Sequence, residues 1–458
     1  MVVQHNMQAM NANRMLNVTT SAQSKSTEKL SSGYRINRAA DDAAGLTISE
    51  KMRKQIRGLD QASTNAEDGV SSVQTAEGAL TEVHSMLQRM NELATQAANG
   101  TNSKDSDRQA IQDEIDQLTT EIDRVSETTK FNETYLLKGD KGATKNVYMN
   151  GHDAGLKGTL TDSAKSATFV MDELKAGNKV TIAGKEYSIG STVADAKASY
   201  AAAADGDTVT IDGTDYTVVG ATEIEDAGAN KLKITTLDTK VKDGSVVSYK
   251  TSKLTVMTDK NNDGVDDDDS SVISKSVAET KIQNELTAAN NIGTVDKAAT
   301  VTKATANGKT TYSIDKGYAT VADTLSFNLH VGADADMTNK INVDIDAMDS
   351  ASLGIKGLNI KDDSGNAATY AVDAISDAIS KVSSQRSSLG AVQNRLEHTI
   401  NNLDNVVENT TTAESRIRDT DMASEMVNYS KNNILAQAGQ SMLAQANQST
   451  QGVLSLLQ

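Results

Sequence analysis

The feature that most constrains this chain is a heptad spacing of apolar residues, which recurs in three long segments. The first segment covers residues 47 to about 98, the second residues 111–125, and the third residues 375–407. In each, apolar side chains are separated by alternating steps of four and three residues, which is typical of helices that pack along a narrow seam. The turn signal Gly100-Thr101-Asn102-Ser103 joins the first two segments, so they are predicted to form an antiparallel helical hairpin.

The third heptad segment lies far downstream, and its seam needs partners. The two N-terminal helices are the obvious ones, so we expect both ends of the chain to return to one coiled-coil bundle. Hydrophobic residues make up 37% of the 458 residues, aromatic residues only 3%, and there is no Pro. This composition favours a thin aliphatic core along long helices, and the absence of Pro removes a common cause of helix interruption.

Residues from about 141 to 345 change in character, with Gly, Thr, Asp, Lys and Val dominating and with alternating apolar and polar positions. Segment 179–189 matches segment 208–218, 29 positions later, and each copy reads as strand, Xaa-Gly turn, strand. The predicted fold class is therefore α+β, with a long-helix coiled-coil bundle and a β-rich inserted outer domain. Further expected elements are a helix at 193–204, a weaker third copy at 307–314, and a strand pair at 325–331 and 341–345.

The two ends of the chain, residues 1–40 and 418–458, are amphipathic, with Met and Leu among Gln, Asn and Ser. Neither end has the composition to bury itself alone. Such segments are expected to be labile in a monomer and ordered in an assembly. The C-terminal positions predicted to carry assembly are Met442, Leu443, Leu454, Leu456 and Leu457.

Charge and motif content exclude several classes of function. The formal net charge of −17 disfavours nucleic acid and anionic lipid as partners. No run approaches the roughly 18 apolar residues of a membrane span, and residues 1–30 lack the pattern of a cleaved secretory signal. The sequence has no Cys, five scattered His, and no zinc-protease motif, phosphate loop or nucleophile elbow. We therefore expect no enzymatic activity and no resident cofactor.

One acidic segment, residues 259–270, resembles a calcium loop of the EF-hand type. Gly264 stands where the loop turns sharply, but Ser270 stands where a bidentate Glu belongs, so any calcium binding is expected to be weak. The alternative is a solvated hairpin turn built on Asp-Gly. The other ligand positions are filled by Asp259, Asn261, Asp263, Val265 and Asp267.

Motifs at both ends of the chain resemble those of bacterial flagellin. The N-terminal motifs are Lys29-Leu30-Ser31-Ser32-Gly33-Tyr34-Arg35-Ile36-Asn37, Asp41-Asp42-Ala43-Ala44-Gly45-Leu46 and Gln55-Ile56-Arg57-Gly58-Leu59. The C-terminal motifs are Ser415-Arg416-Ile417-Arg418-Asp419, Asp421-Met422-Ala423 and Met442-Leu443-Ala444-Gln445-Ala446-Asn447. Together they cover roughly residues 1–140 and 345–458, and the middle carries no family signature.

The resemblance implies a structural subunit that polymerises into the extracellular flagellar filament used for motility and is exported unfolded by the flagellar type III system. Its implied partners are many copies of itself, an export chaperone, and the filament cap and hook-junction proteins. Alternatives are a hook-filament junction protein and a soluble coiled-coil adhesin. The implied domains are terminal helices of an inner tube (1–42 and 418–458), a helical bundle with β-hairpins (43–140 and 345–417), and a variable surface insertion (141–344).

The hairpin helices also resemble the region by which an innate-immune Toll-like receptor senses the free flagellin monomer. Subunit packing is the simpler role of this face, and receptor recognition exploits it. Leu93 follows Arg89 by four positions on the same helical face, so it is expected to supply an apolar contact beside the guanidinium. The matching positions are Gln88, Arg89, Leu93, Ile111 and Glu114.

Overall fold

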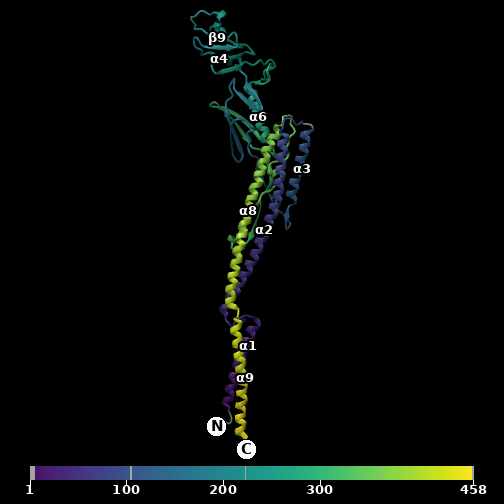
Figure 1. The fold of residues 1–458 in the computed structure, drawn as a ribbon, viewed down its shortest axis with the longest axis vertical. Coiled ribbons are helices and arrows are strands. Elements are labelled where there is room, and N and C mark those ends of the chain that lie inside the picture. The colour runs from purple at the N-terminus through teal and green to yellow at the C-terminus, as the bar shows by residue number, and fades with distance from the viewer. Residues whose placement is uncertain (1–5, 104–105, 222, 363, 456–458) are drawn as a thin grey trace. The chain divides into compact units, whose positions relative to one another are not determined.

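The structure is a computed structural model that describes residues 6–103, 106–221, 223–362 and 364–455. It divides into two compact units, the first of residues 1–73, 327–343 and 391–458, the second of residues 74–326 and 344–390. Two of the divisions fall inside the continuous helices α2 (Ala43–Ala97) and α8 (Asn366–Arg418) (Figure 1). Long helices at both ends flank a strand-rich middle, so the predicted α+β class is confirmed.

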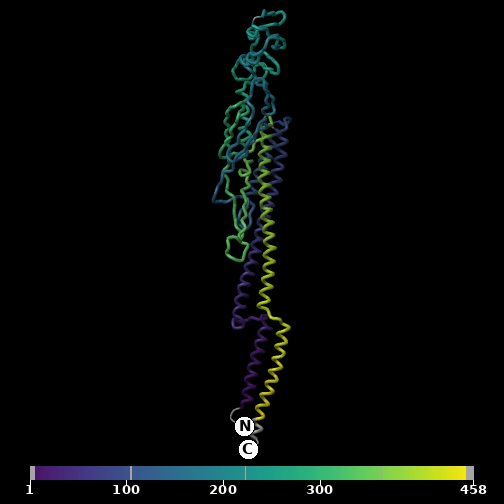
Figure 2. Tube along the Cα trace, turned by 90° about the vertical axis from the view of Figure 1, so that its left-hand side faces the viewer, coloured from purple at the N-terminus to yellow at the C-terminus, as the bar shows by residue number. Residues whose placement is uncertain are grey.

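In the first unit, α1 (Met7–Ser32) and α9 (Met422–Ser455) lie side by side, as Figures 1 and 2 show. Gly33 caps the C-terminus of helix α1, and its φ of 76° is the left-handed conformation that glycine adopts without strain. Just beyond it, the Arg35 N–H donates to the Arg418 carbonyl at 2.7 Å. The start of the chain and its C-terminal segment are therefore neighbours, which confirms the predicted return of the ends.

The rest of the first unit is built on an antiparallel pair formed by the start of α2 and the end of α8. Ser49 donates to Glu414 at 2.8 Å and Ser63 to Asp404 at 3.3 Å, so residue numbers rise along one helix as they fall along the other. The predicted strand pair is present as β17 (Leu325–His330) and β18 (Lys340–Ile345). It packs on both helices through Ala66, Val70, Leu329, Val331, Ile341, Val392, Leu396 and Ile400.

In the second unit, the remainder of α2, α3 (Asp107–Thr128) and the start of α8 contain the second heptad seam and parts of the first and third. Helices α2 and α3 are antiparallel, because Arg89 pairs with Glu114 while Arg108, near the start of α3, donates to the Ala97 carbonyl at the end of α2. The seam positions that are fully buried are Ala76, Leu80, Val83, Leu87, Met90, Ala94, Ile115, Ile122, Ile375, Val382 and Leu389.

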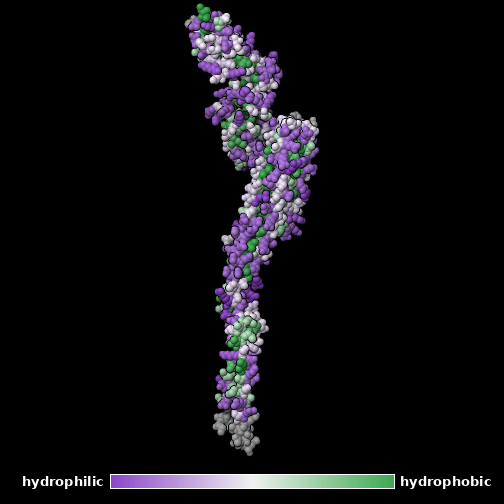
Figure 3. All heavy atoms as spheres, in the orientation of Figure 1, coloured by the Kyte–Doolittle hydropathy of each residue, from purple (hydrophilic) through white to green (hydrophobic). Residues whose placement is uncertain are grey.

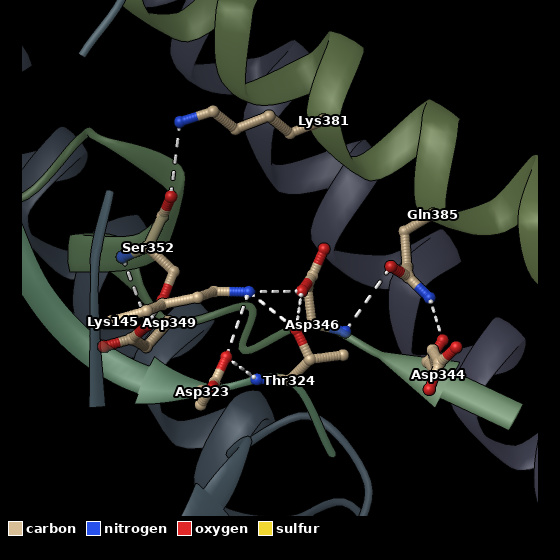
Figure 4. A network of polar contacts seen from close by, with 9 residues as sticks. All are labelled: Lys145, Asp323, Thr324, Asp344, Asp346, Asp349, Ser352, Lys381 and Gln385. Atoms are coloured by element: carbon tan, nitrogen blue, oxygen red, sulfur yellow. Dashed lines mark hydrogen bonds and ion pairs between the residues drawn. The ribbon is translucent and has the colours of Figure 1, made fainter. Parts of the chain in front are cut away.

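Strands β3 (Asp140–Tyr148) and β16 (Tyr318–Asp323) pair antiparallel where the chain leaves the helices of the second unit and returns to them. Figure 4 shows the polar network at this place. The Lys145 amine lies 2.6 Å from an Asp346 carboxylate oxygen and 2.7 Å from the Thr324 hydroxyl, and Gln385 of α8 donates to the Asp344 carbonyl at 3.0 Å. The flanking short elements are β1 (Lys130–Phe131), β2 (Thr134–Tyr135) and α7 (Ser350–Leu353).

A four-stranded sheet follows in the order β14-β15-β5-β4, covered by α6 (Lys275–Asn290). Phe169 and Tyr312 are fully buried in it, beside Ile282 and Leu286 of the helix. The predicted weaker copy at 307–314 is the turn and second strand of a hairpin in this sheet. The strands are β4 (Thr159–Asp162), β5 (Ser166–Asp172), β14 (Thr300–Ala306) and β15 (Lys309–Asp315).

The predicted duplication is confirmed as two hairpins, β6–β7 and β8–β9, each turning through a residue pair with positive φ, Ala183-Gly184 and Asp212-Gly213. Their elements are β6 (Lys179–Ile182), β7 (Lys185–Ile189), α4 (Val193–Tyr200), β8 (Thr208–Ile211) and β9 (Thr214–Val218). Helix α4 stops four residues before the predicted end at 204.

The structure contains a further copy of this hairpin that the sequence pattern did not reveal, β11 (Val246–Tyr249) and β12 (Ser252–Thr255). Every copy begins with a glycine N–H bonded to the carbonyl at the end of its second strand: Gly177 to Ile189, Gly206 to Val218, and Gly244 to Val256. Short elements complete the region: β10 (Lys231–Leu232), α5 (Ile234–Leu237) and β13 (Val272–Ile273), with 3-10 turns at Ala227–Ala229 and Met337–Asn339.

Candidate interaction surfaces

The first candidate surface is the polar face of the α2–α3 hairpin. The Arg89 Nε donates to Glu114 at 2.9 Å, and its Nη1 donates to Glu92 at 3.1 Å. Gln88 lies 3.1 Å from the His84 ring and, like Arg89 and Glu114, is exposed. The structure therefore joins Arg89 and Glu114 across the two helices, while Gln88, next to Arg89 in the chain, contacts His84 instead.

The two apolar positions of the predicted receptor face lie elsewhere. Leu93 is 2% exposed and Ile111 is 7% exposed, so both belong to the core of the second unit. The expectation that Leu93 offers a surface contact beside Arg89 is wrong. It is wrong because α2 has helical neighbours on more than one side, and the buried stripe is wider than the strict heptad seam.

The second candidate surface, called the apolar face of α1 and α9, consists of the exposed apolar side chains of the two helices, among them Met7, Met10, Val18, Val427 and Ile434. A groove of about 650 Å³ lies between the two helices, lined in part by Met15, Leu16, Leu435 and Met442. Met442 is 60% exposed and Leu443 is partly buried. Leu454 lies within α9, and the predicted positions Leu456 and Leu457 fall outside the described residues. Figure 3 shows apolar and polar residues mixed at the surface over these helices.

The acidic segment that resembles a calcium loop is a compact turn held by its own backbone. The two Asp259 carboxylate oxygens accept the N–H groups of Asp263 at 3.2 Å and Gly264 at 2.9 Å, Asp263 accepts that of Val265, and Asp267 accepts that of Lys260. Asn261 likewise accepts from Asp263. All five predicted ligands are thus brought into one loop.

Sequence reasoning missed the carboxylate that organises this turn. Asp266 is 6% exposed and accepts three backbone N–H groups, those of Thr258, Asp268 and Asp269. A run of four consecutive Asp residues gives no signal for which one points inward. Among the described residues, no three His, Cys, Asp or Glu side chains form a group that could hold a metal ion. To bind calcium, the carboxylates of this loop would have to give up their hydrogen bonds with backbone N–H groups and coordinate the metal instead.

Calcium binding by this loop stays a prediction, with a dissociation constant of ~10⁻⁴ to 10⁻³ M because the bidentate twelfth ligand is missing. Titration calorimetry of the whole chain should show heat at millimolar calcium that disappears in Asp259→Ala. Asp268→Ala is the matched control, since its exposed side chain is not among the predicted ligands. No heat from the parent chain would establish the solvated acidic turn.

A partly buried charge cluster ties the loop between β3 and β4 to α8. The His152 Nε2 lies 3.3 Å from an Asp377 carboxylate oxygen, and its backbone N–H and C=O both bond to the Asn290 side chain of α6. Burial lowers the pKa of His152, but the hydrogen bond to Asp377 and the charges of Asp377, Asp373 and Asp153 outweigh it, so the pKa is raised. Burial raises the pKa of Asp373.

This cluster predicts a loss of stability as the pH rises. Because the folded-state pKa of His152 is raised, its contribution is complete below the unfolded value of about 6.5 and is lost as the pH rises through the folded pKa. Thermal unfolding of the parent chain, followed by tyrosine fluorescence, should occur at lower temperature toward alkaline pH. His152→Gln should flatten this dependence above the ordinary histidine pKa of about 6.5. An unchanged slope in the variant would show that other groups are responsible.

Within the part of the chain that the structure describes, none of the helices combines the length and apolar character that a membrane crossing requires. The apolar seams of α2, α3 and α8 are buried, whereas α1 and α9 carry exposed apolar side chains.

Comparison with known proteins agrees with an architecture of long helices at both ends. Residues 3–142 match the bacterial flagellin N-terminal helical region, and residues 372–457 match the bacterial flagellin C-terminal helical region. The chain is 41% identical to a flagellin of Clostridium tyrobutyricum, over 98% of this chain and 100% of that protein. It is 36% identical to the flagellin of Bacillus subtilis (strain 168) over 100% of both chains. The chain therefore belongs to the bacterial flagellin family, a family of structural proteins and not of enzymes.

Proposed function

We propose that this chain self-polymerises into the flagellar filament, outside the cell, through the apolar face of α1 and α9. The observation that carries the proposal is the exposure of large apolar side chains after the two helices have paired within one chain. Met7, Met10 and Val18 of α1 are 69%, 63% and 60% exposed, and Val427 and Ile434 of α9 are 68% and 66% exposed. Burying each such side chain contributes about 1.5–3 kcal/mol, so the face is more stable when covered.

The proposal is tested by polymerisation of the purified chain. Monomers obtained by acid dissociation, returned to neutral pH and given short filament fragments as seeds, should elongate into tubes visible by electron microscopy. A soluble adhesin would stay monomeric under the same conditions. The predicted division into inner-tube helices, outer-tube bundle and surface insertion would then be read from a reconstruction of the filament.

Export in the unfolded state through the flagellar type III system is part of the same proposal. The chain has no Pro and no Cys, so neither prolyl isomerisation nor disulfide exchange would delay folding after export. The open apolar face of α9 would need a cytoplasmic export chaperone, and growth at the tip would involve the filament cap and hook-junction proteins. A pull-down in which removal of residues 418–458 leaves chaperone binding intact would refute the chaperone part.

For the free monomer, we propose recognition by an innate-immune Toll-like receptor through Gln88, Arg89 and Glu114. Arg89→Ala is expected to weaken receptor binding by roughly 1–3 kcal/mol, because its planar guanidinium can make forked hydrogen bonds at an interface hot spot. The variant should keep its fold, since exposed ion pairs such as Arg89–Glu114 contribute only about 0–1 kcal/mol. Binding is measured by titrating immobilised receptor with monomer.

Arg124→Ala is the matched control for Arg89→Ala, because Arg124 also pairs with a glutamate three residues away, Glu121, and is similarly exposed. Receptor binding by intact filaments should be much weaker than by monomers at equal subunit concentration, if filament packing covers this face. Equal binding by both forms would show that the face stays open after assembly.

A further inference from the structure

An exposed basic segment stands out on this acidic chain. Residues 51–57, on the N-terminal part of α2, contain Lys51, Arg53, Lys54 and Arg57 and no acidic residue. All four side chains are exposed, whereas Met52 and Ile56 on the other side of the helix are partly buried. The segment is therefore a concentrated patch of positive charge on a chain whose formal net charge is −17.

None of the carboxylates in the described residues pairs with this patch. Glu50, the adjacent acid, lies 3.1 Å from Arg418, and the polar side-chain contact of Arg57 is with the backbone carbonyl of Arg53 at 3.5 Å. The turn between β17 and β18 approaches α2 next to the patch, where Ala333 lies against Gly58, but neither Asp334 nor Asp336 in that turn is within 4.0 Å of the four cations. The patch is thus available to a partner.

The α2–α3 hairpin of the same chain is rich in acidic residues, some of which already have partners: Glu77 pairs with Arg386, Glu121 with Arg124 and Glu127 with Lys138. Between Gln74 and Thr128, the α2–α3 hairpin has eleven acidic and four basic residues. Arg89 on this face is already balanced by Glu92 and Glu114. Glu82 and Asp113 are exposed and make no ion pair within the described residues. Electrostatic complementarity of this kind steers association and sets the register of packing.

We propose that the basic segment of residues 51–57 on one copy of the chain docks against the acidic face of the α2–α3 hairpin on a second copy during filament growth. This inference rests on the proposed polymerisation and adds the surface pair that guides each incoming subunit. The patch contributes mainly to the rate and register of addition, while the apolar face of α1 and α9 holds the added subunit.

The first test is seeded elongation of full-length chain with parent seeds, followed by light scattering. Arg53→Glu/Lys54→Glu should elongate about tenfold more slowly than the parent at ~0.01 M salt, where charges act over ~30 Å, because electrostatic steering accelerates association by 10–10³. At ~1 M salt, where the Debye length is ~3 Å, the parent and the variant should elongate at similar rates. Circular dichroism should show the same helix content in both.

The matched control is Lys240→Glu/Lys242→Glu, which makes the same change in net charge at two exposed lysines near α5. It should elongate like the parent chain. If it is slowed as much as the α2 variant, net charge alone is responsible and the docking surface is refuted.

The second test exchanges the charges. Adding Glu82→Lys/Asp113→Lys to Arg53→Glu/Lys54→Glu should restore elongation among copies that carry all four changes, using seeds of the same variant. Failure of this rescue would overturn the assignment of the acidic hairpin as the partner surface. Parent chain that does not elongate at any salt concentration would refute the proposed polymerisation itself, whereas parent elongation equal to that of the α2 variant at low salt would refute only this inference.

Discussion

Removing residues 1–40 or 418–458 is expected to abolish filament formation and to leave a folded, soluble, helical monomer. In the single chain, α1 and α9 cover each other only in part, and Met7, Met10, Ile434 and Met442 remain at least 60% exposed. Either truncation removes one helix of the pair and the face that polymerisation would bury. The seams of α2, α3 and α8 are buried without these residues, so the second unit should fold normally.

The C-terminal truncation needs one refinement that the structure supplies. Arg418 lies 3.1 Å from Glu50, and its carbonyl accepts the Arg35 N–H, so a cut at 418 also removes contacts within the first unit. A second truncation beginning at Thr420 keeps Arg418 and serves as the control for damage to the bundle. Sedimentation and electron microscopy measure the outcome. Filaments from a truncated chain would show that α1 or α9 is dispensable for assembly.

The sequence predicts the helical parts of this chain well because a heptad seam depends on local spacing. Leu80, Leu87 and Ala94 are each fully buried, as their positions require. Leu93 shows the limit of that reasoning. A seam identifies one contact line, but it does not reveal how many helices surround α2, and this number decides how wide the buried stripe is.

The strands are predictable where a turn carries an Xaa-Gly pair or where apolar and polar residues alternate cleanly, as in β17 and β18, and are missed where neither signal is present. The hairpin of β11 and β12 turns through Lys250, which has a positive φ of 53°. Because no glycine follows Lys250, the sequence gives no signal for this turn. Asp266 is a similar case, because it is one of four consecutive Asp residues and only the structure shows that it is the one that turns inward to accept the N–H groups of Thr258, Asp268 and Asp269. The basic patch at 51–57 needed the structure too, since only the structure shows that its charges are unpaired.

The outer strands of the second unit are expected to be dispensable for polymerisation when they are removed at the right place. The structure gives that place, because the Met149 N–H donates to the Gly317 carbonyl at 3.1 Å. Deleting residues 150–316 and joining these two positions by a short turn keeps the β3–β16 pair and the Lys145–Asp346 contact. The variant should form filaments of smaller diameter, measured by electron microscopy, because both proposed polymerisation surfaces lie outside the deleted segment.

The wider deletion of residues 141–345, drawn at the sequence boundary, provides the comparison. It also removes β17 and β18, whose Leu329 and Ile341 pack with Ala66 and Leu396 in the first unit. Ile341 is buried, and loss of such a side chain costs about 2–5 kcal/mol, so this variant should unfold at lower denaturant concentration and assemble poorly. If the 150–316 deletion is folded by circular dichroism yet stays monomeric where the parent polymerises, the outer strands supply essential contacts between subunits. If both deletions polymerise equally well, the β17–β18 hairpin is not needed to hold α2 and α8 in register for assembly.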